Sequence, residues 1–119
     1  MKEYAIKHKH LNIKLSAPVK KYLEIKDILV ILIYPSDDQL LLYPREKLNR
    51  NVYAFKESNG ELLWQIQPAN EGGASEDKPF MDIFISQGKL IVGNWIGIDY
   101  QIDLSNGHIN PIDRNKRPW

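Results

Sequence analysis

Two histidines near the start of the chain have a spacing that could serve metal binding. His8 and His10 are separated by one lysine, so an extended strand would present both imidazoles on one face. A stable zinc site takes three or four ligands, whereas the only other histidine, His108, belongs to a distant hairpin. Lysines flank the pair and would repel a cation. The sequence therefore favours a solvated basic strand, with no metal and no cofactor.

The sequence gives weaker indications of other kinds of catalytic site than of a metal site. No serine lies in a nucleophile elbow, and the Gly72–Ser75 stretch lacks the lysine and helix that complete a phosphate cradle. Two carboxylates could converge as in a glycosidase, but strand alternation predicts that Asp82 and Asp99 lie on exposed faces, where a surface role is expected. We therefore expect a protein that is not an enzyme.

The length and composition of the chain predict one ordinary domain over residues 1–119. Hydrophobic residues make up 43% of the chain and charged residues 26%, as in globular proteins. The chain has no cysteine, and its sequence shows no signal-peptide or membrane-length apolar stretch, so we expect a cytoplasmic protein. Residues 1–26 carry a net charge of +5 and residues 66–113 a net charge of −5. The overall pI of about 7.9 disfavours nucleic-acid binding.

A repeated pattern gives the strongest indication of fold. Tyr53–Gly60 returns 47 residues later as Tyr100–Gly107, with Tyr, Ser, Asn and Gly in register. Each copy reads as strand, tight turn and strand, and the spacing is that of β-propeller blades. Two copies cannot close a ring of about four to eight blades. We expect two blade-like repeats at about residues 51–67 and 98–112.

The remaining segments also read as strands. Residues 28–34 form a continuous aliphatic run typical of a strand buried on both faces, and residues 16–23 fit either a helical turn or a twisted strand. Long loops are expected over residues 35–50 and 68–79. The prediction is an all-β protein: an antiparallel meander of about seven to nine strands, forming a sandwich or an incomplete-propeller-like sheet pair, with at most one short helix.

Two tryptophans have different expected roles. Trp64 alternates with apolar neighbours and is expected in the core. Trp95 lies in a glycine-flanked bend, where it would either cap the core or contact a partner.

A resemblance rests on the core and turn residues of these hairpins. The residues that carry it are Asn51-Val52-Tyr53-Ala54-Phe55, Asn59-Gly60, Leu63-Trp64-Gln65-Ile66, Pro79-Phe80, Asn94-Trp95-Ile96-Gly97, Tyr100-Gln101-Ile102-Asp103 and Asn106-Gly107-His108-Ile109. Over residues 19–112 the chain resembles a family of small stand-alone bacterial proteins with blade-like hairpins, and single hairpins resemble quinoprotein-type propeller repeats. The resemblance implies a toxin immunity protein of a contact-dependent or secreted antibacterial system.

The functional hypothesis is a non-enzymatic binding protein that occludes its cognate toxin, possibly a nuclease, as a monomer or in a 1:1 complex. Acidic side chains would meet a basic toxin. The expected partner-binding residues are Glu71, Glu76, Asp77, Asp82 and Asp99, with Trp95 and Tyr100 as aromatic anchors. The alternative is a small-ligand or carbohydrate-binding module that uses Trp95 and Tyr43 as stacking platforms.

Overall fold

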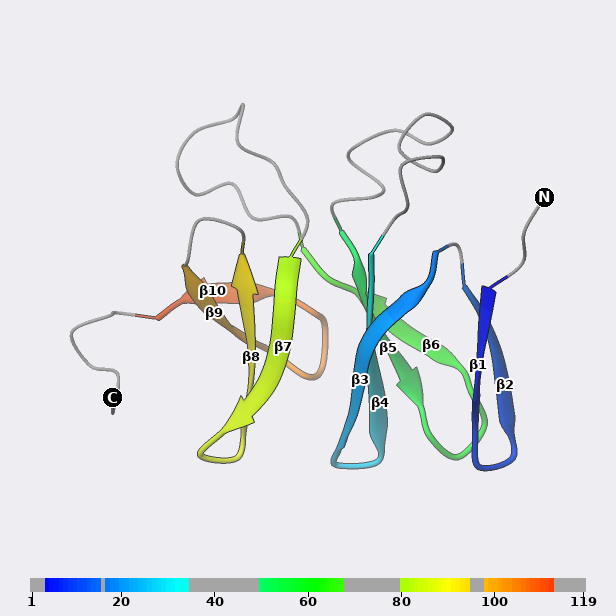
Figure 1. The fold of residues 1–119 in the computed structure, drawn as a ribbon. Coiled ribbons are helices and arrows are strands. Elements are labelled where there is room, and N and C mark those ends of the chain that lie inside the picture. Colours follow the sequence, from blue (N-terminus) through cyan, green and yellow to red (C-terminus); the bar gives the residue numbers. More distant parts are fainter. Residues whose placement is uncertain (1–3, 16, 35–49, 68–79, 95–97, 113–119) are drawn as a thin grey trace.

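The computed structural model of the chain describes residues 4–15, 17–34, 50–67, 80–94 and 98–112. These residues form ten strands and no helix, arranged in three antiparallel sheets (Figure 1). The strands are β1 (Tyr4–His8), β2 (Leu11–Leu15), β3 (Val19–Ile25), β4 (Ile28–Ile33), β5 (Val52–Lys56), β6 (Leu62–Gln65), β7 (Phe80–Ser86), β8 (Lys89–Asn94), β9 (Asp99–Ile102) and β10 (Ile109–Pro111). The all-β antiparallel fold predicted from the sequence is confirmed, with one strand more than expected.

Strand β3 decides between the two interpretations of residues 16–23 in favour of a strand. It pairs with β4 and its register shifts between Val19 and Lys21, which is the mark of a β-bulge. A bulge adds local twist, so the apolar residues of this segment do not keep a clean period of two. The predicted loops at 35–50 and 68–79 lie outside the described residues, apart from Arg50.

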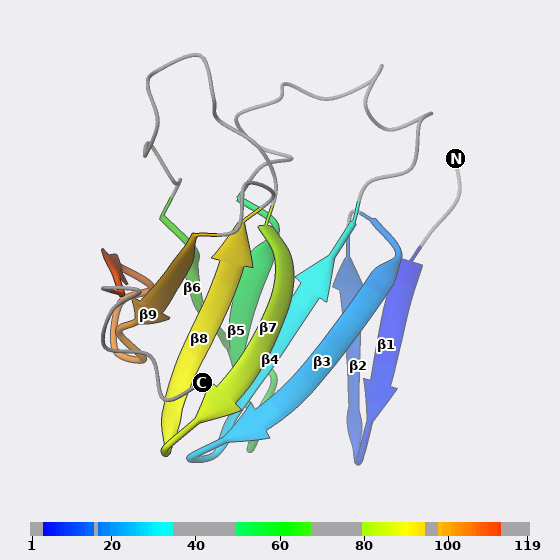
Figure 2. The same cartoon turned by 60° about the vertical axis from the view of Figure 1, so that its left-hand side comes forward.

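The three sheets stack as layers. Sheet β3–β6 lies in the middle, with the β1–β2 hairpin against one face and sheet β7–β10 against the other (Figures 1 and 2). An apolar core fills each of the two spaces. Strand β4 serves both cores: Leu29, Ile31 and Ile33 pack toward the hairpin, while Val30 and Leu32 pack toward the second sheet. This alternation confirms the prediction of a strand buried on both faces.

A single asparagine ties the two four-stranded sheets together. Asn51 is fully buried, and its Nδ2 donates hydrogen bonds to the carbonyl oxygens of Ile33 (2.7 Å) and Phe80 (3.0 Å). Its Oδ1 accepts a bond from the Phe80 N–H at 2.8 Å. A buried amide with satisfied donors and acceptor is stable in an apolar interior, and here it fixes where β7 begins relative to β4 and β5.

The repeated pattern corresponds to two turns of the same geometry. In each, the glycine has a φ of +77° and its N–H donates to the carbonyl four residues earlier, from Gly60 to Lys56 at 2.7 Å and from Gly107 to Asp103 at 2.8 Å. The preceding asparagine closes the turn, because its Oδ1 accepts the N–H two residues later at 2.9 Å in both copies. Ser, Asn and Gly are therefore turn residues, as the sequence predicted.

Each turn is covered by the neighbouring layer. Trp64 is buried against Gly107, and its Nε1–H donates to the carbonyl oxygen of Leu104 at 2.7 Å. At the first turn, Leu11 packs over Gly60 and His10 Nε2 bonds to the carbonyl oxygen of Ser58 at 2.9 Å. Trp64 is a core residue, as expected. The repeat thus marks the two places where successive layers dock.

The last sheet differs from the middle sheet on its outer face. In the middle sheet, Ala54 pairs with Val30 and Trp64, and all three belong to the core. At the corresponding register of the last sheet, Gln101 pairs with Ile91 and Asn110, and both polar side chains are exposed. Terminal repeats of stacked proteins carry a polar outer face, because that face meets water. The last sheet therefore has exposed polar side chains at the register where the middle sheet has core residues.

Candidate functional site

The predicted partner-binding residues do not form one surface among the described residues. Glu71, Glu76, Asp77 and Trp95 lie outside those residues. Asp82 is exposed as predicted, and its Oδ1 lies 3.0 Å from Lys21 Nζ on β3. This ion pair links the edge strands β7 and β3. Asp82 therefore already has a cationic partner within the fold.

The expectation of an exposed face is wrong for Asp99, and the burial of Tyr100 removes it as an aromatic anchor for a partner. Tyr100 is 1% exposed and packs edge-to-face on Phe80, with ring centroids 6.2 Å apart, so it is part of the core. Asp99 is 9% exposed although it points away from that core. It pairs with Gly93, where the missing side chain lets the carboxylate approach closely: a Cβ on Gly93 would stand 3.1 Å from Asp99 Oδ1. Strand alternation alone does not reveal that approach.

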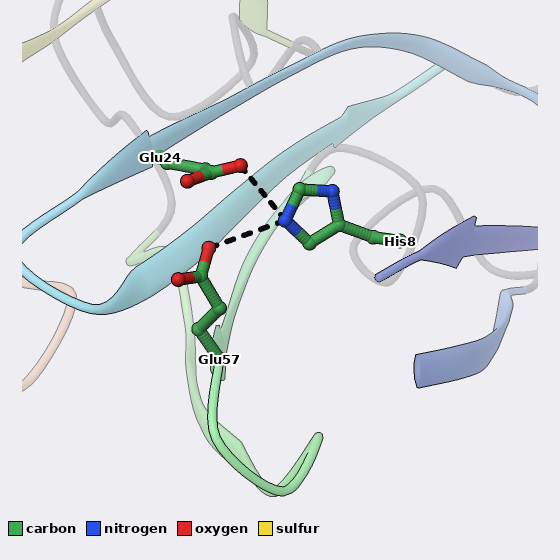
Figure 3. Close-up of side chains that lie close together, drawn as sticks. All are labelled: His8, Glu24 and Glu57. Atoms are coloured by element: carbon green, nitrogen blue, oxygen red, sulfur yellow. Dashed lines mark hydrogen bonds and ion pairs between the residues drawn. The ribbon is translucent and has the colours of Figure 1, made fainter. Parts of the chain in front are cut away.

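A cluster of His8, Glu24 and Glu57 is the feature with the most chemical potential in the described part of the chain. His8 Nε2 lies 2.8 Å from Glu24 Oε1 and 3.2 Å from Glu57 Oε2 (Figure 3). His8 ends β1, Glu24 belongs to β3 and Glu57 follows β5, so the three side chains come from three separate elements. The side chains of His8 and Glu57 are only 11% and 14% exposed. His8 is therefore not the solvated strand residue expected from the sequence.

The local fold explains why these side chains meet. The turns after β1, β3 and β5 lie at the same end of the stack (Figure 1), and the Glu57 N–H donates to the Asp27 carbonyl at 3.0 Å. Asp27 and Lys9 both take positive φ, as tight hairpins require. Three hairpin turns thus converge and place one functional side chain each at the junction.

Lys9 adds a positive charge beside the cluster. Its Nζ lies 3.0 Å from Glu57 Oε1 and 3.8 Å from Glu24 Oε2. The hydrogen bond from Lys9 holds the pKa of Glu57 below its ordinary value of 4.5, and the bond with His8 acts in the same direction. In turn, the bond to Glu57 raises the pKa of Lys9 above its ordinary 10.5. At neutral pH both groups are therefore charged.

Sequence reasoning missed Glu24 and Glu57 as partners of His8. They lie 16 and 49 residues further along the chain, and neither has a local motif with the histidine. The usable signal was positional, since both glutamates lie at or next to predicted hairpin ends. The expectation of no metal at His8 and His10 rested on a missing third ligand, and the fold supplies two carboxylates in its place.

Comparison with known proteins gives a family without a known activity. Residues 2–113 match a family described as a domain of unknown function, DUF7957. No curated protein and no solved structure matches the chain. Within the described residues, no helix has the length and apolarity needed to cross a membrane.

Proposed function

The chain belongs to the DUF7957 family of unknown function, and we propose that it is a non-enzymatic protein-binding module whose docking surface includes the edge strand β6. More narrowly, we propose a bacterial immunity protein that acts in the cytoplasm and neutralises a cognate toxin by covering its active site. The narrower proposal derives from the sequence resemblance and the acidic C-terminal half, while the broader one has support in the fold.

The observation that carries the proposal is a pair of exposed leucines. Leu62 and Leu63 are 53% and 40% exposed on β6, which has a strand neighbour on only one side among the described strands. Adjacent strand residues normally point to opposite faces, but a register shift opposite Phe55 leaves both of these leucines in solvent. Consecutive exposed leucines on an open edge are unusual in a protein without a partner, because such edges recruit other chains.

Acidic side chains would attract the partner that the exposed leucines bind. The acidic segment with Glu71, Glu76 and Asp77 follows β6 in the chain, whereas exposed Asp82 lies on β7 and pairs with Lys21 on β3, the opposite edge of the middle sheet from β6. An acidic surface accelerates encounter with a basic partner such as a nuclease, while a small apolar patch supplies most of the binding energy. We expect a 1:1 complex in which the leucines anchor the partner and the acidic residues steer it.

The proposal predicts that a toxin domain is encoded beside this protein's gene, and the test measures how this protein binds and inhibits that domain. We expect the wild-type protein to abolish that domain's activity, and Leu63→Asp to weaken binding about 30-fold or more, as for a central interface residue. Ile85→Asp is the matched control, since it puts the same charge at an exposed apolar position of β7, which lies beside β3 and away from β6. Equal affinities of the two variants would remove β6 from the interface.

A second experiment tests the acidic segment. Glu76→Lys with Asp77→Lys should slow association and leave the unfolding midpoint unchanged. Unchanged association kinetics would remove this segment from the proposed surface. The carbohydrate-binding alternative depends on Trp95 and Tyr43, which lie outside the described residues, and no described residue favours it.

A further inference from the structure

We propose that His8, Glu24 and Glu57 bind a divalent cation of the zinc class and that this ion fastens the β1–β2 hairpin to the middle sheet. The proposal is independent of the protein-binding function. It rests on the donor set, on the distances between the donors and on the elements that carry them.

The donor atoms have the spacing that such an ion requires. His8 Nε2 is 2.8 Å from Glu24 Oε1 and 3.2 Å from Glu57 Oε2, and one donor atom from each residue lies within 4.8 Å of the other two. Zinc with ligands at about 2.0–2.1 Å in a tetrahedron holds neighbouring ligand atoms about 3.3 Å apart. The three donor atoms are therefore close enough together for one ion to reach all of them.

Figure 3 shows that His8 Nε2 faces the space between the two carboxylates, with Glu24 approaching from β3 and Glu57 from the turn after β5. Carboxylate oxygens accept hydrogen bonds and do not donate them when ionised, so Nε2 carries a proton in this contact. The same nitrogen without its proton offers a lone pair in the same direction. A cation between the carboxylates would take the place of that proton, and imidazole with carboxylates is a donor set that zinc accepts.

Lys9 does not occupy the position proposed for the ion. Its ammonium contacts Oε1 of Glu57 and Oε2 of Glu24, whereas His8 contacts the other oxygen of each carboxylate. Lys9 is 55% exposed, so its repulsion of an ion is reduced by solvent. Three carboxylates, those of Glu24, Glu57 and Asp27, act on the charge of Lys9. A divalent ion would therefore enter a locally negative site.

The residues around the proposed ion position would hold the ligands in place and leave one side open to solvent. The Tyr22 ring stands edge-on to the His8 imidazole, with centroids 5.8 Å apart, and limits the rotation of the imidazole. Glu24 is 44% exposed, so the ion can enter past this side chain and keep a water as a fourth ligand. Because the three ligands come from β1, β3 and the turn after β5, binding would hold the hairpin and the middle sheet together.

The experiment titrates Zn²⁺ into the full chain by calorimetry and uses Co²⁺ as a spectroscopic probe of geometry. We expect one equivalent of Zn²⁺ to bind, intense visible Co²⁺ bands of a tetrahedral site, and a Tm increase of about 8 °C at a free Zn²⁺ concentration 100-fold above Kd. Absence of wild-type binding, or a Co²⁺ spectrum of a weakly held octahedral ion, would overturn the proposal.

Variants separate this site from adventitious binding. His8→Gln should abolish Zn²⁺ binding, whereas His10→Gln, the matched control, should leave it unchanged because His10 contacts the Ser58 carbonyl instead. Glu24→Gln changes a half-exposed side chain and should weaken Zn²⁺ binding at least about 10-fold, which keeps the test available if His8→Gln unfolds. Lys9→Gln should tighten binding several-fold by removing the competing charge. Equal losses in His8→Gln and His10→Gln would contradict the assignment.

Discussion

Alanine at the two equivalent turn glycines should have clearly different effects. Gly60 and Gly107 share a φ of +77°, so alanine pays the same left-handed backbone cost of about 1 kcal/mol at both. Their surroundings differ. A Cβ on Gly60 would stand 3.3 Å from Leu11 Cδ2, the end of a flexible side chain, whereas a Cβ on Gly107 would stand 2.7 Å from a ring carbon of Trp64.

Moving the Trp64 side chain to make room for this Cβ would cost free energy. Its ring is 94% removed from solvent in the core between the sheets, and its Nε1–H is bonded to the Leu104 carbonyl. Overpacking of this kind costs about 1–3 kcal/mol. We therefore expect Gly60→Ala to lower the free energy of unfolding by about 1 kcal/mol and Gly107→Ala by about 2–4 kcal/mol.

Equilibrium urea unfolding, followed by tryptophan fluorescence and circular dichroism, measures both values. The double variant Gly107→Ala, Trp64→Leu supplies the control, because a smaller side chain should reduce the extra penalty of the alanine when the reference is Trp64→Leu alone. Equal destabilisation by the two single alanine substitutions would refute the docking of Trp64 on the second turn.

Three further predictions concern other parts of the fold. Asn51→Ala should lower the free energy of unfolding by about 3 kcal/mol, because buried backbone groups of both sheets lose their partner; a loss below about 1 kcal/mol in urea unfolding would contradict that role. Trp64→Phe should cost about 1 kcal/mol through the lost bond to Leu104, and a neutral result would show that this bond adds nothing. Hydrogen bonds from the Ser105 hydroxyl and N–H hold the pKa of Asp103 below its ordinary value of 3.8. The ionised carboxylate therefore stabilises the fold above pH 3.8, and this stabilisation is lost as pH falls through the pKa of Asp103 in the folded state. We expect Asp103→Asn to be less stable than wild type at pH 7 and equally stable in strong acid. A difference in stability that persists in acid would contradict this.

The sequence predicted the strands well because their signals are local. Residues 28–34 carry enough consecutive aliphatic side chains to define a strand buried on both faces, and Ser-Asn-Gly defines the turns at 58–60 and 105–107. The equivalence of the two copies stops at the turns and cores, because the register occupied by Ala54 in the middle sheet holds exposed Gln101 in the last.

The candidate sites were harder to predict because they depend on how layers meet. The burial of Asp99 depends on a glycine in the neighbouring strand, and the exposure of both Leu62 and Leu63 depends on a bulge. The partners of His8 come from two other hairpins. No local pattern contains these contacts, since each results from the register between strands or the stacking between sheets.

Amide hydrogen exchange in the complex shows whether a partner protein docks on the β6 edge. With the cognate toxin domain bound, we expect slower exchange in the segment that contains Leu62 and Leu63, and unchanged exchange in the β7 segment that contains exposed Ile85, because β7 lies beside β3, the opposite edge of the middle sheet from β6. A tight complex in which the exchange of the β6 segment stays as it is in the free protein would contradict docking on this edge.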